Sequence, residues 1–411
     1  MNYVSVPIDK GTISLKTKPR SIPWTSSSRN EGSYINYYNS FLEVTIRFVF
    51  TSAIGANTKL YLKKPHNCVV EKMDGQFSFV DPQTGQECGL DISENIMDES
   101  FYRAALDYCF CNKDKQLLDD FMPCWLGMNN YYSATDNAPF DHVVKDLDVD
   151  TTNKTAIWKC RVPIRLLSGF AARNAFLNTR NFVCKLYFND IFSIVKQFND
   201  GSSTTNSDFT TASVSSVDIT NIDFYYDMTL LQADETDLLD PQLLNIPQTK
   251  IERGLTTATL PAAGQELRIK FNDTLNFSPK MCVFFFTDED NNMCDLLKLS
   301  PTYLKISTGG ETNLNPAMDP DSSNKQPDYR LWAMTKQGLD RNNQPCMDYV
   351  IWKQSARFYI YSFAENFSLL ENNNYINYEI RIKADSVDNN KKINIHRVYL
   401  KDYLNVFETE D

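Results

Sequence analysis

The chain has 411 residues, which at about 150 residues per domain predicts two or three domains. Its 42% hydrophobic and 23% charged residues match ordinary globular proteins and exclude wholesale disorder. Its 41 basic and 52 acidic side chains leave a net charge of −11, which argues against the binding of nucleic acid across a basic surface. Aromatic residues reach 13%, and because Phe and Tyr favour pleated strands, the composition favours a β protein.

The first residues, Met1–Lys10, lack the apolar stretch of a signal peptide. The longest apolar run, Met281–Phe286, has six residues, far fewer than the roughly 18 that a membrane-spanning helix needs. We therefore expect a protein that is neither secreted by the usual route nor inserted in a membrane.

Cysteine and histidine, the residues that most often carry metal or covalent chemistry, are scattered. Without a secretory signal, the ten cysteines are expected to be free thiols used as small apolar residues. The close pair Cys109 and Cys111 has no second pair or histidine at zinc-ligand spacing. The isolated His66, His142 and His396 are expected to be packed or surface residues. The sequence has no Gly-rich phosphate loop, dinucleotide fingerprint or nucleophile elbow, so we expect no enzyme, no catalytic residue and no cofactor.

Three acidic stretches, which begin at Asp146, Asp288 and Asp319, have the clustered carboxylates of a calcium loop. None of them has the Gly at the sixth position and the Glu at the twelfth that an EF-hand requires, so we expect solvated turns and no metal site. A carboxylate pair for glycoside hydrolysis stays open, because such pairs meet only in the folded protein.

Residues 1–35 are predicted to form a basic N-terminal arm rather than a domain. The stretch Pro19–Ser28 is rich in serine and broken by prolines, which suits an extended segment. Five cations against Asp9 and Glu31 give the arm a local net charge of +3. A solvated tail is one interpretation, and an arm that contacts phosphate or neighbouring subunits is the sharper one. The candidate contact residues are Lys10, Lys16, Lys18, Arg20 and Arg29.

From Phe41 on, apolar and polar residues alternate, which predicts a strand with one buried face over 41–50. The period lengthens between Ser93 and Leu126, where one or two helices are expected. Further strands of the first half are predicted over 59–63, 67–73, 76–80, 156–164, 182–189 and 217–231.

The second half continues the strand pattern, with a loop expected over 309–328 and a short helix over 329–339. Its strands are predicted over 245–252, 265–271, 280–287, 302–306, 346–352, 357–363, 375–383 and 392–407. Many short strands with turn-rich spacers and few helices indicate an all-β sandwich or barrel.

The two halves share a weak internal repeat. The apolar offsets of Val217–Phe224 match those of Ile393–Leu400, and the pattern of Phe182–Phe188 matches that of Asn377–Ile382. The acidic stretch Gln232–Pro241 interrupts the strand pattern between the halves. We therefore predict two similar units, over 36–231 and 232–411, after the arm.

Four stretches follow one another in a recognisable order: Trp158–Phe170, Asp223–Leu231, Pro279–Thr287 with Leu299–Ile306, and Lys392–Phe407. In this order they resemble the double jelly-roll major capsid proteins of tailless icosahedral DNA viruses, the group of adenovirus hexon, virophages and Polinton-like viruses. The resemblance is one of strand pattern over most of residues 36–411. It departs at the proline turn of the first unit, where Leu166-Leu167 replaces the usual Leu-Phe pair.

The resemblance implies two consecutive eight-stranded jelly rolls, with short helices in long loop insertions over 93–155 and 287–345. It also implies a homotrimer whose six jelly rolls form a pseudo-hexagonal capsomer, and capsomers that tile an icosahedral virion shell around a DNA genome. The implied partners are neighbouring capsomers, minor capsid and penton proteins, and, through the arm, genome DNA or an internal membrane.

Two other classes of protein also fit parts of the sequence. The acidic, aromatic-rich composition is typical of carbohydrate-binding or carbohydrate-active β-sandwiches, which are usually exported. A single-unit penton or fibre-like component of a viral shell is the other alternative, and the length and the internal repeat speak against it.

Overall fold

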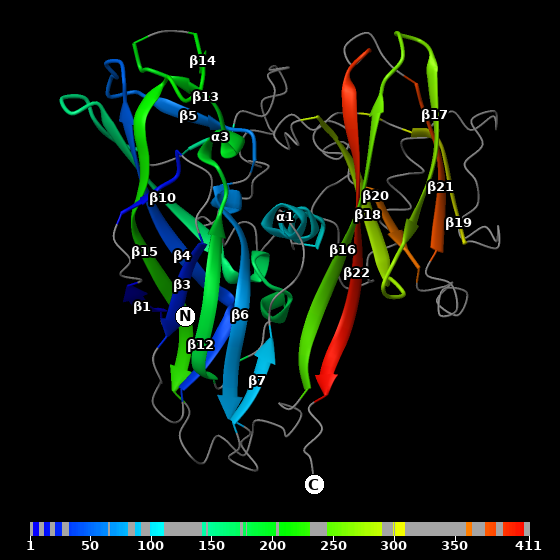
Figure 1. Cartoon of the computed structure of the whole chain (residues 1–411), viewed down its shortest axis with the longest axis horizontal. Helices are drawn as coiled ribbons and strands as arrows, with labels where there is room; N and C mark the ends of the chain where they lie inside the picture. The colour runs from blue at the N-terminus through cyan, green and yellow to red at the C-terminus, as the bar shows by residue number, and fades with distance from the viewer. Residues whose placement is uncertain are drawn as a thin grey trace. The chain divides into compact units, whose positions relative to one another are not determined.

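The structure is a computed structural model, drawn in Figure 1. It describes residues 3–7, 12–16, 21–26, 33–64, 66–80, 87–91, 99–110, 142–144, 147–172, 176–177, 179–202, 205–230, 245–289, 299, 301–308, 359–363, 375–383 and 389–406. The loop, helix and strand predicted over 309–328, 329–339 and 346–352 lie outside these residues.

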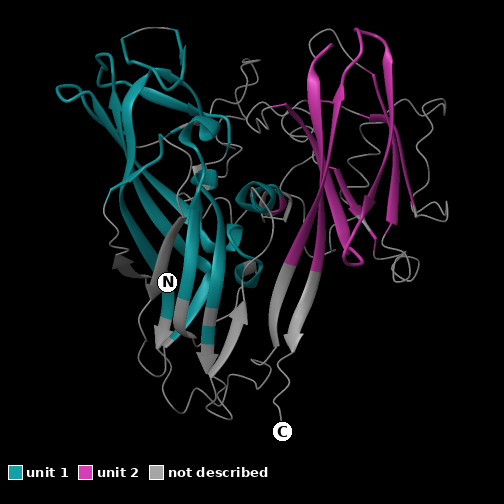
Figure 2. Cartoon of the chain, viewed as in Figure 1, with its two compact units in different colours: residues 1–105, 141–249, 403–411 teal, residues 106–140, 250–402 magenta. Residues whose placement is uncertain are grey.

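The chain divides into two compact units, coloured separately in Figure 2. Unit 1 consists of residues 1–105, 141–249 and 403–411, and unit 2 of residues 106–140 and 250–402.

Two antiparallel sheets built on long strands form most of unit 1. The first sheet has the order β1 (Tyr3–Pro7), β15 (Val214–Leu230), β4 (Ser33–Phe50), β10 (Thr155–Pro163) and β9 (Asp148–Asp150), with β2 (Ile13–Ser14) on β15 and β11 (Phe176–Leu177) on β4. The second sheet has the order β3 (Ser21–Ser26), β12 (Thr179–Phe188), β6 (Val70–Val80) and β7 (Glu87–Asp91). Along β4, Leu42, Val44, Ile46 and Phe48 are fully buried, which confirms the alternation predicted from Phe41 on.

Shorter elements complete unit 1. A small sheet has the order β14 (Ser207–Asp208), β13 (Val195–Asn199), β5 (Lys59–Leu62) and β8 (His142–Val143). The helical turns are η1 (His66–Val69), η3 (Ile164–Leu166), η4 (Gly169–Ala172) and α3 (Ile191–Ile194). The helix α1 (Glu99–Phe110), of which residues 99–105 belong to unit 1, confirms the helix predicted between Ser93 and Leu126. Within it, Arg103 Nε donates to Glu99 Oε1 at 2.5 Å, and both side chains are buried.

Three segments of the predicted arm are strands of unit 1. β1 and β2 pair with β15, and β3 pairs with β12. Their pairing takes up backbone groups that a free tail would leave to water, so the structure assigns these segments to the sheets rather than to a tail that stands apart. Pro7 and Pro23 made these strands hard to recognise, and both lie in strands at the edge of a sheet, where a proline is tolerated.

Unit 2 also has two antiparallel sheets. The first has the order β16 (Asn245–Thr259), β22 (Lys392–Val406), β18 (Met281–Asp288) and β20 (Tyr359–Ser362), and the second has the order β17 (Glu266–Thr274), β21 (Tyr375–Lys383) and β19 (Pro301–Thr308). All seven were predicted as strands. β15 ends at Leu230 and β16 begins at Asn245, and the predicted boundary after Leu231 falls between these two strands.

Both units use the same strand order, which is that of a jelly roll. Counted along each unit, the last long strand lies between the first strand and a middle strand: β15 lies between β1 and β4, and β22 lies between β16 and β18. In the second sheets, β12 lies between β3 and β6, and β21 lies between β17 and β19. The internal repeat predicted from sequence matched β15 with β22 and β12 with β21, and the strand orders confirm both matches. The fold is all-β and consists of two jelly rolls.

Aromatic side chains fill both sandwiches. In unit 1 the ring centroid of Phe48 lies 6.4 Å from that of Phe50 and 6.0 Å from that of Phe209. In unit 2 the rings of Phe284 and Tyr359 stack with centroids 4.7 Å apart. All five side chains are buried, so the high aromatic content of the sequence supplies core volume.

A buried ion pair joins the two sheets of unit 2. Arg397 of β22 donates from Nε and Nη2 to the carboxylate of Asp273 of β17, at 2.5 and 2.7 Å. The hydroxyl of Tyr399 donates to the same carboxylate and lies 2.8 Å from the hydroxyl of Tyr378. Burial by itself lowers the pKa of the Arg397 guanidinium, but the hydrogen bonds to Asp273 raise that pKa above its ordinary value. Gly254 of β16 leaves room for this pair, because a Cβ there would lie 2.5 Å from the carboxylate and 2.7 Å from the guanidinium.

Replacement of the buried carboxylate, Asp273→Asn, is expected to lower the free energy of unfolding by about 3–5 kcal/mol, because it leaves the Arg397 charge buried without its anion. The matched control is Glu266→Gln, which breaks an ion pair with Arg268 whose side chains are 31% and 68% exposed. That control should cost less than about 1 kcal/mol. Urea unfolding measures the free energy of unfolding of both variants. Equal losses of this free energy in the two variants would contradict the assignment of the buried pair.

Four of the ten cysteines, Cys68, Cys160, Cys184 and Cys282, are buried free thiols, as predicted. Burial raises the pKa of the Cys282 thiol from 9.0 to about 12. The native protein should therefore resist alkylation by iodoacetamide at these four positions at about pH 8 and react at all four once unfolded, as read by peptide mass spectrometry. Rapid native alkylation would contradict the burial.

Because the folded pKa of Cys282 lies above the unfolded one, its contribution to stability is present below pH 9.0 and is lost as the pH rises toward about 12.

Candidate assembly surface

Of the five cations predicted as arm contacts, the structure describes Lys16. Its Nζ donates to the backbone oxygens of Val214 and Ser215 at 2.7 and 3.1 Å. This side chain therefore binds the start of β15 within its own unit. The other four, Lys10, Lys18, Arg20 and Arg29, lie outside the described residues, and their role stays a prediction.

His396, one of the residues considered for catalysis or metal binding, has the surroundings of a packed core residue. His396 is fully buried, its Nε2 lies 2.8 Å from the hydroxyl of Thr287, and its ring stacks on Phe285 with centroids 4.9 Å apart. This confirms the expectation that His396 is a packed residue. Across the described ranges, no group of three or more His, Cys, Asp and Glu side chains could hold a metal ion. Within the same ranges, no helix has both the length and the apolar character needed to cross a membrane.

The exposed outer face of the second sheet of unit 2 carries a dense set of charged side chains. Along β17 every second residue is exposed, beginning with Glu266, Arg268 and Lys270, while Leu267 and Ile269 between them turn to the other face. Along β21 the residues Ile376, Tyr378, Ile380 and Ile382 are buried, so Glu379 and Arg381 share the outer face with the charges of β17.

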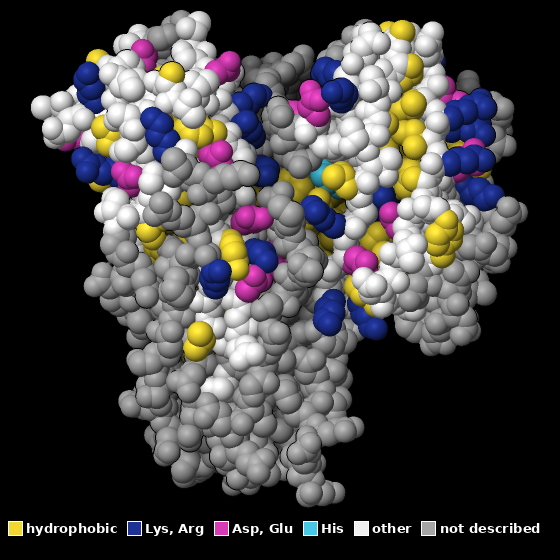
Figure 3. All heavy atoms as spheres, in the orientation of Figure 1, with side chains coloured by type: hydrophobic (Ala, Val, Ile, Leu, Met, Phe, Trp, Pro, Cys, Tyr) yellow, Lys and Arg dark blue, Asp and Glu magenta, His cyan; other side chains and the backbone are white. Residues whose placement is uncertain are grey.

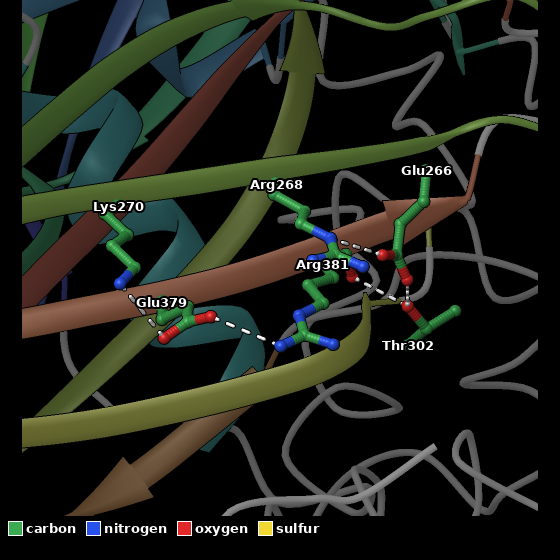
Figure 4. A network of polar contacts seen from close by, with 6 residues as sticks. All are labelled: Glu266, Arg268, Lys270, Thr302, Glu379 and Arg381. Atoms are coloured by element: carbon green, nitrogen blue, oxygen red, sulfur yellow. Dashed lines mark hydrogen bonds and ion pairs between the residues drawn. The ribbon is translucent and has the colours of Figure 1, made fainter. Parts of the chain in front are cut away.

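Antiparallel pairing sets these charges side by side. Arg268 of β17 lies opposite Arg381 of β21, and Lys270 lies opposite Glu379. Figure 4 shows the network that results. Glu379 accepts from Arg381 Nη2 at 3.5 Å and pairs with Lys270 Nζ at 3.7 Å, while Glu266 accepts from Arg268 Nε at 2.9 Å. The two carboxylates therefore pair with three cations, two on β17 and one on β21.

The third strand, β19, extends the same face. Thr302 donates to Glu266 Oε1 at 3.3 Å and also lies 3.2 Å from the backbone oxygen of Arg381. The guanidinium of Arg381 lies over the ring of Tyr303, 4.4 Å from its centroid. Next along the strand, Lys305 lies opposite Glu379. The face is thus a mixed-charge surface with one aromatic ring under a cation.

This outer face has a cationic surplus in an acidic protein. Its five cations are Arg268, Lys270, Lys305, Arg381 and Lys383, against the carboxylates of Glu266 and Glu379. Figure 3 shows basic side chains gathered over this part of unit 2, at the upper right of the view. Because the side chains of Lys270 and Arg268 are 79% and 68% exposed, the ion pairs are screened by water and contribute little to folding. Their charges remain available to a partner.

The chemistry of this face is that of binding. Salt-screened lysine and arginine side chains on a flat sheet can attract an anionic surface, and the tyrosine adds a partly apolar contact. Sequence reasoning missed this face, although the alternation of charged and apolar residues over 266–274 and 375–383 was visible. The register that sets Arg381 between Arg268 and Tyr303 depends on which strands pair, and the sequence does not show that.

The comparisons with known proteins support the fold. No family model matches the chain, and no curated protein matches it. A chain of the Sputnik virophage structure, determined by cryo-EM, superposes with a TM-score of 0.56 at 10% identity, over 98% of this chain and 87% of that one. The crystal structure of the mavirus major capsid protein superposes with a TM-score of 0.53 at 9% identity, again over 98% of this chain and 87% of that one.

At these identities the comparisons show the fold. They extend over nearly the whole chain, so both jelly rolls and their order in the sequence are shared. The resemblance stated from the strand pattern is confirmed at this level: the chain has the double jelly-roll fold of these viral proteins.

Proposed function

We propose that this chain is the major capsid protein of an icosahedral DNA virus and that three copies form a pseudo-hexagonal capsomer. The observation that carries the proposal is the repeated strand order of the two units, in a fold shared with the mavirus major capsid protein. Closed threefold symmetry turns two similar units per chain into six similar units per ring, which is the shape that tiles a shell.

The chemistry of the described residues fits a structural role. Among the described charged groups, Arg397 and Asp273 form a buried ion pair that joins two strands, and Arg268 and Glu266 form an ion pair on an exposed sheet face. We infer a protein that works by assembly in the virion, without catalysis. Its proposed partners are its own copies, neighbouring capsomers, and minor capsid and penton proteins.

The proposed trimer is tested by the mass of the native protein. One chain has a mass of 47.3 kDa, so static light scattering after gel filtration should give about 140 kDa, unchanged on dilution to low micromolar concentration. A well-folded particle with the mass of one chain would contradict the capsomer.

The arm is proposed to contact the genome through Lys10, Lys18, Arg20 and Arg29. Each phosphate contact contributes about 0.9 to the slope of log K against log salt concentration for duplex DNA. Replacing all four cations by Gln should therefore lower that slope by up to about 3.6 in fluorescence anisotropy titrations.

Lys16→Gln is the matched control for the arm, because Lys16 already donates to two backbone oxygens of β15. It should leave the salt slope nearly unchanged. An unchanged slope in the fourfold variant would instead remove the arm from DNA binding and leave an internal membrane as its proposed partner.

A further inference from the structure

The outer face of the second sheet of unit 1 carries a compact polar cluster between β6 and β12. Tyr187 lies opposite Lys72, and Lys185 lies opposite Asp74. Both lysines lie over the tyrosine ring, with Nζ 4.7 Å from its centroid for Lys72 and 5.2 Å for Lys185. Lys72 Nζ also pairs with Asp74 at 2.8 Å. One ring, two cations and one carboxylate thus occupy two neighbouring cross-strand pairs.

Unit 2 has the same four chemical groups between β19 and β21, the strands that correspond to β6 and β12. Tyr303 lies opposite Arg381, and Lys305 lies opposite Glu379. The guanidinium of Arg381 lies 4.4 Å from the centroid of the Tyr303 ring and its Nη2 lies 3.5 Å from Glu379. We call these two groups of four residues the four-residue motifs of the two units.

The two motifs follow one rule. In each, the tyrosine faces a cation, that cation pairs with a carboxylate two residues along its own strand, and the carboxylate faces a second cation two residues from the tyrosine. The two strands exchange roles, since the tyrosine lies on β12 in unit 1 and on β19 in unit 2. Two halves that share only a weak pattern in sequence therefore present the same surface chemistry at the same place in each jelly roll.

The second cation of each motif, Lys185 or Lys305, has no ion pair among the described residues. Lys185 is exposed and Lys305 is half-buried. Beside Lys185 on the same face, Val183 is 50% exposed, one of two large apolar side chains that stand out in this way in the described chain. A lysine next to an exposed apolar side chain and an aromatic ring is a composition found in protein interfaces.

We propose that the two four-residue motifs are equivalent lateral contact sites for a carboxylate-bearing surface of a second copy of this chain. This rests on the proposed capsomer, because a pseudo-sixfold block meets its neighbours through both kinds of jelly roll and so needs like chemistry on each. Charge complementarity supports the occupant: the chain carries 11 more acidic than basic side chains, while each motif has two cations and one carboxylate.

A protein surface fits these motifs better than a nucleic acid does. Each motif places a carboxylate, Asp74 or Glu379, between its two cations. A phosphate backbone that followed the cations would meet this negative charge, whereas a protein surface can place a donor there. Nucleic-acid binding at these faces is therefore an outcome of the test and would overturn the proposal.

The test uses the full chain with the double substitution Lys185→Glu and Lys305→Glu. The matched control is Lys59→Glu with Lys159→Glu, which makes the same change in net charge at two exposed lysines outside both motifs. A second variant, Lys185→Gln with Lys305→Gln, removes the charges without reversing them. Sedimentation equilibrium separates the tight trimer from weaker association between trimers, and a series of salt concentrations spans the range over which the Debye length falls from about 30 to about 3 Å.

In wild-type protein the association between trimers should lose affinity as salt rises, because it joins opposite charges. The Glu double variant should form trimers normally, but its trimers should associate with one another more weakly at low salt, by about tenfold or more. The Gln variant should weaken this association less, and the control should match wild type. The proposal is overturned if association between trimers is absent in wild-type protein or becomes stronger as salt rises. It is also overturned if the affinity of this association is unchanged in the Glu variant or falls equally in the control. Loss of wild-type binding to duplex DNA in the Glu variant would overturn it too. Failure of the proposed capsomer is a separate result, namely a wild-type protein without the tight trimer.

Discussion

The fold depends on the return of each unit's last long strand to the place where the unit begins. β15 forms backbone ladders with β1 at the N-terminus and with β4, and β22 lies between β16 and β18 in the same way. These are pairings between residues far apart in the chain, so the loop-closure entropy must be overcome before they stabilise the sheet. Once they form, each unit becomes a sandwich whose inner faces are filled by aromatic and branched side chains.

Charge serves two different purposes on the two faces of the second sheet of unit 2. Inside unit 2, Asp273 and Arg397 join the sheets in a nearly dry environment, where loss of either partner leaves an uncompensated charge. On the outer face, Glu379 and its cations lie in water, where each pair contributes little to folding and is screened by salt. The same residue types therefore hold the sandwich together on one side and stay available for assembly on the other.

Much of the fold was predictable, because alternation of apolar and polar residues follows directly from a sheet with one buried face. All strands of unit 2 that the structure describes were predicted, and so was the equivalence of β15 with β22. The strands of the arm were missed, since Pro7 and Pro23 mark a break unless the strand lies at a sheet edge. The four-residue motifs were also missed, because Tyr187 and Lys72 are 115 residues apart and meet only through the register of β12 on β6.

Images of the purified native protein by negative-stain electron microscopy test the central claim most directly. If the two similar units of each chain are the building elements of a threefold capsomer, the particles should be pseudo-hexagonal blocks with six lobes of similar size, or shells made of such blocks. Uniform particles with the size of one chain and two lobes would contradict the account, because a double jelly roll that does not assemble would leave the repeated surface chemistry of its two units without a use.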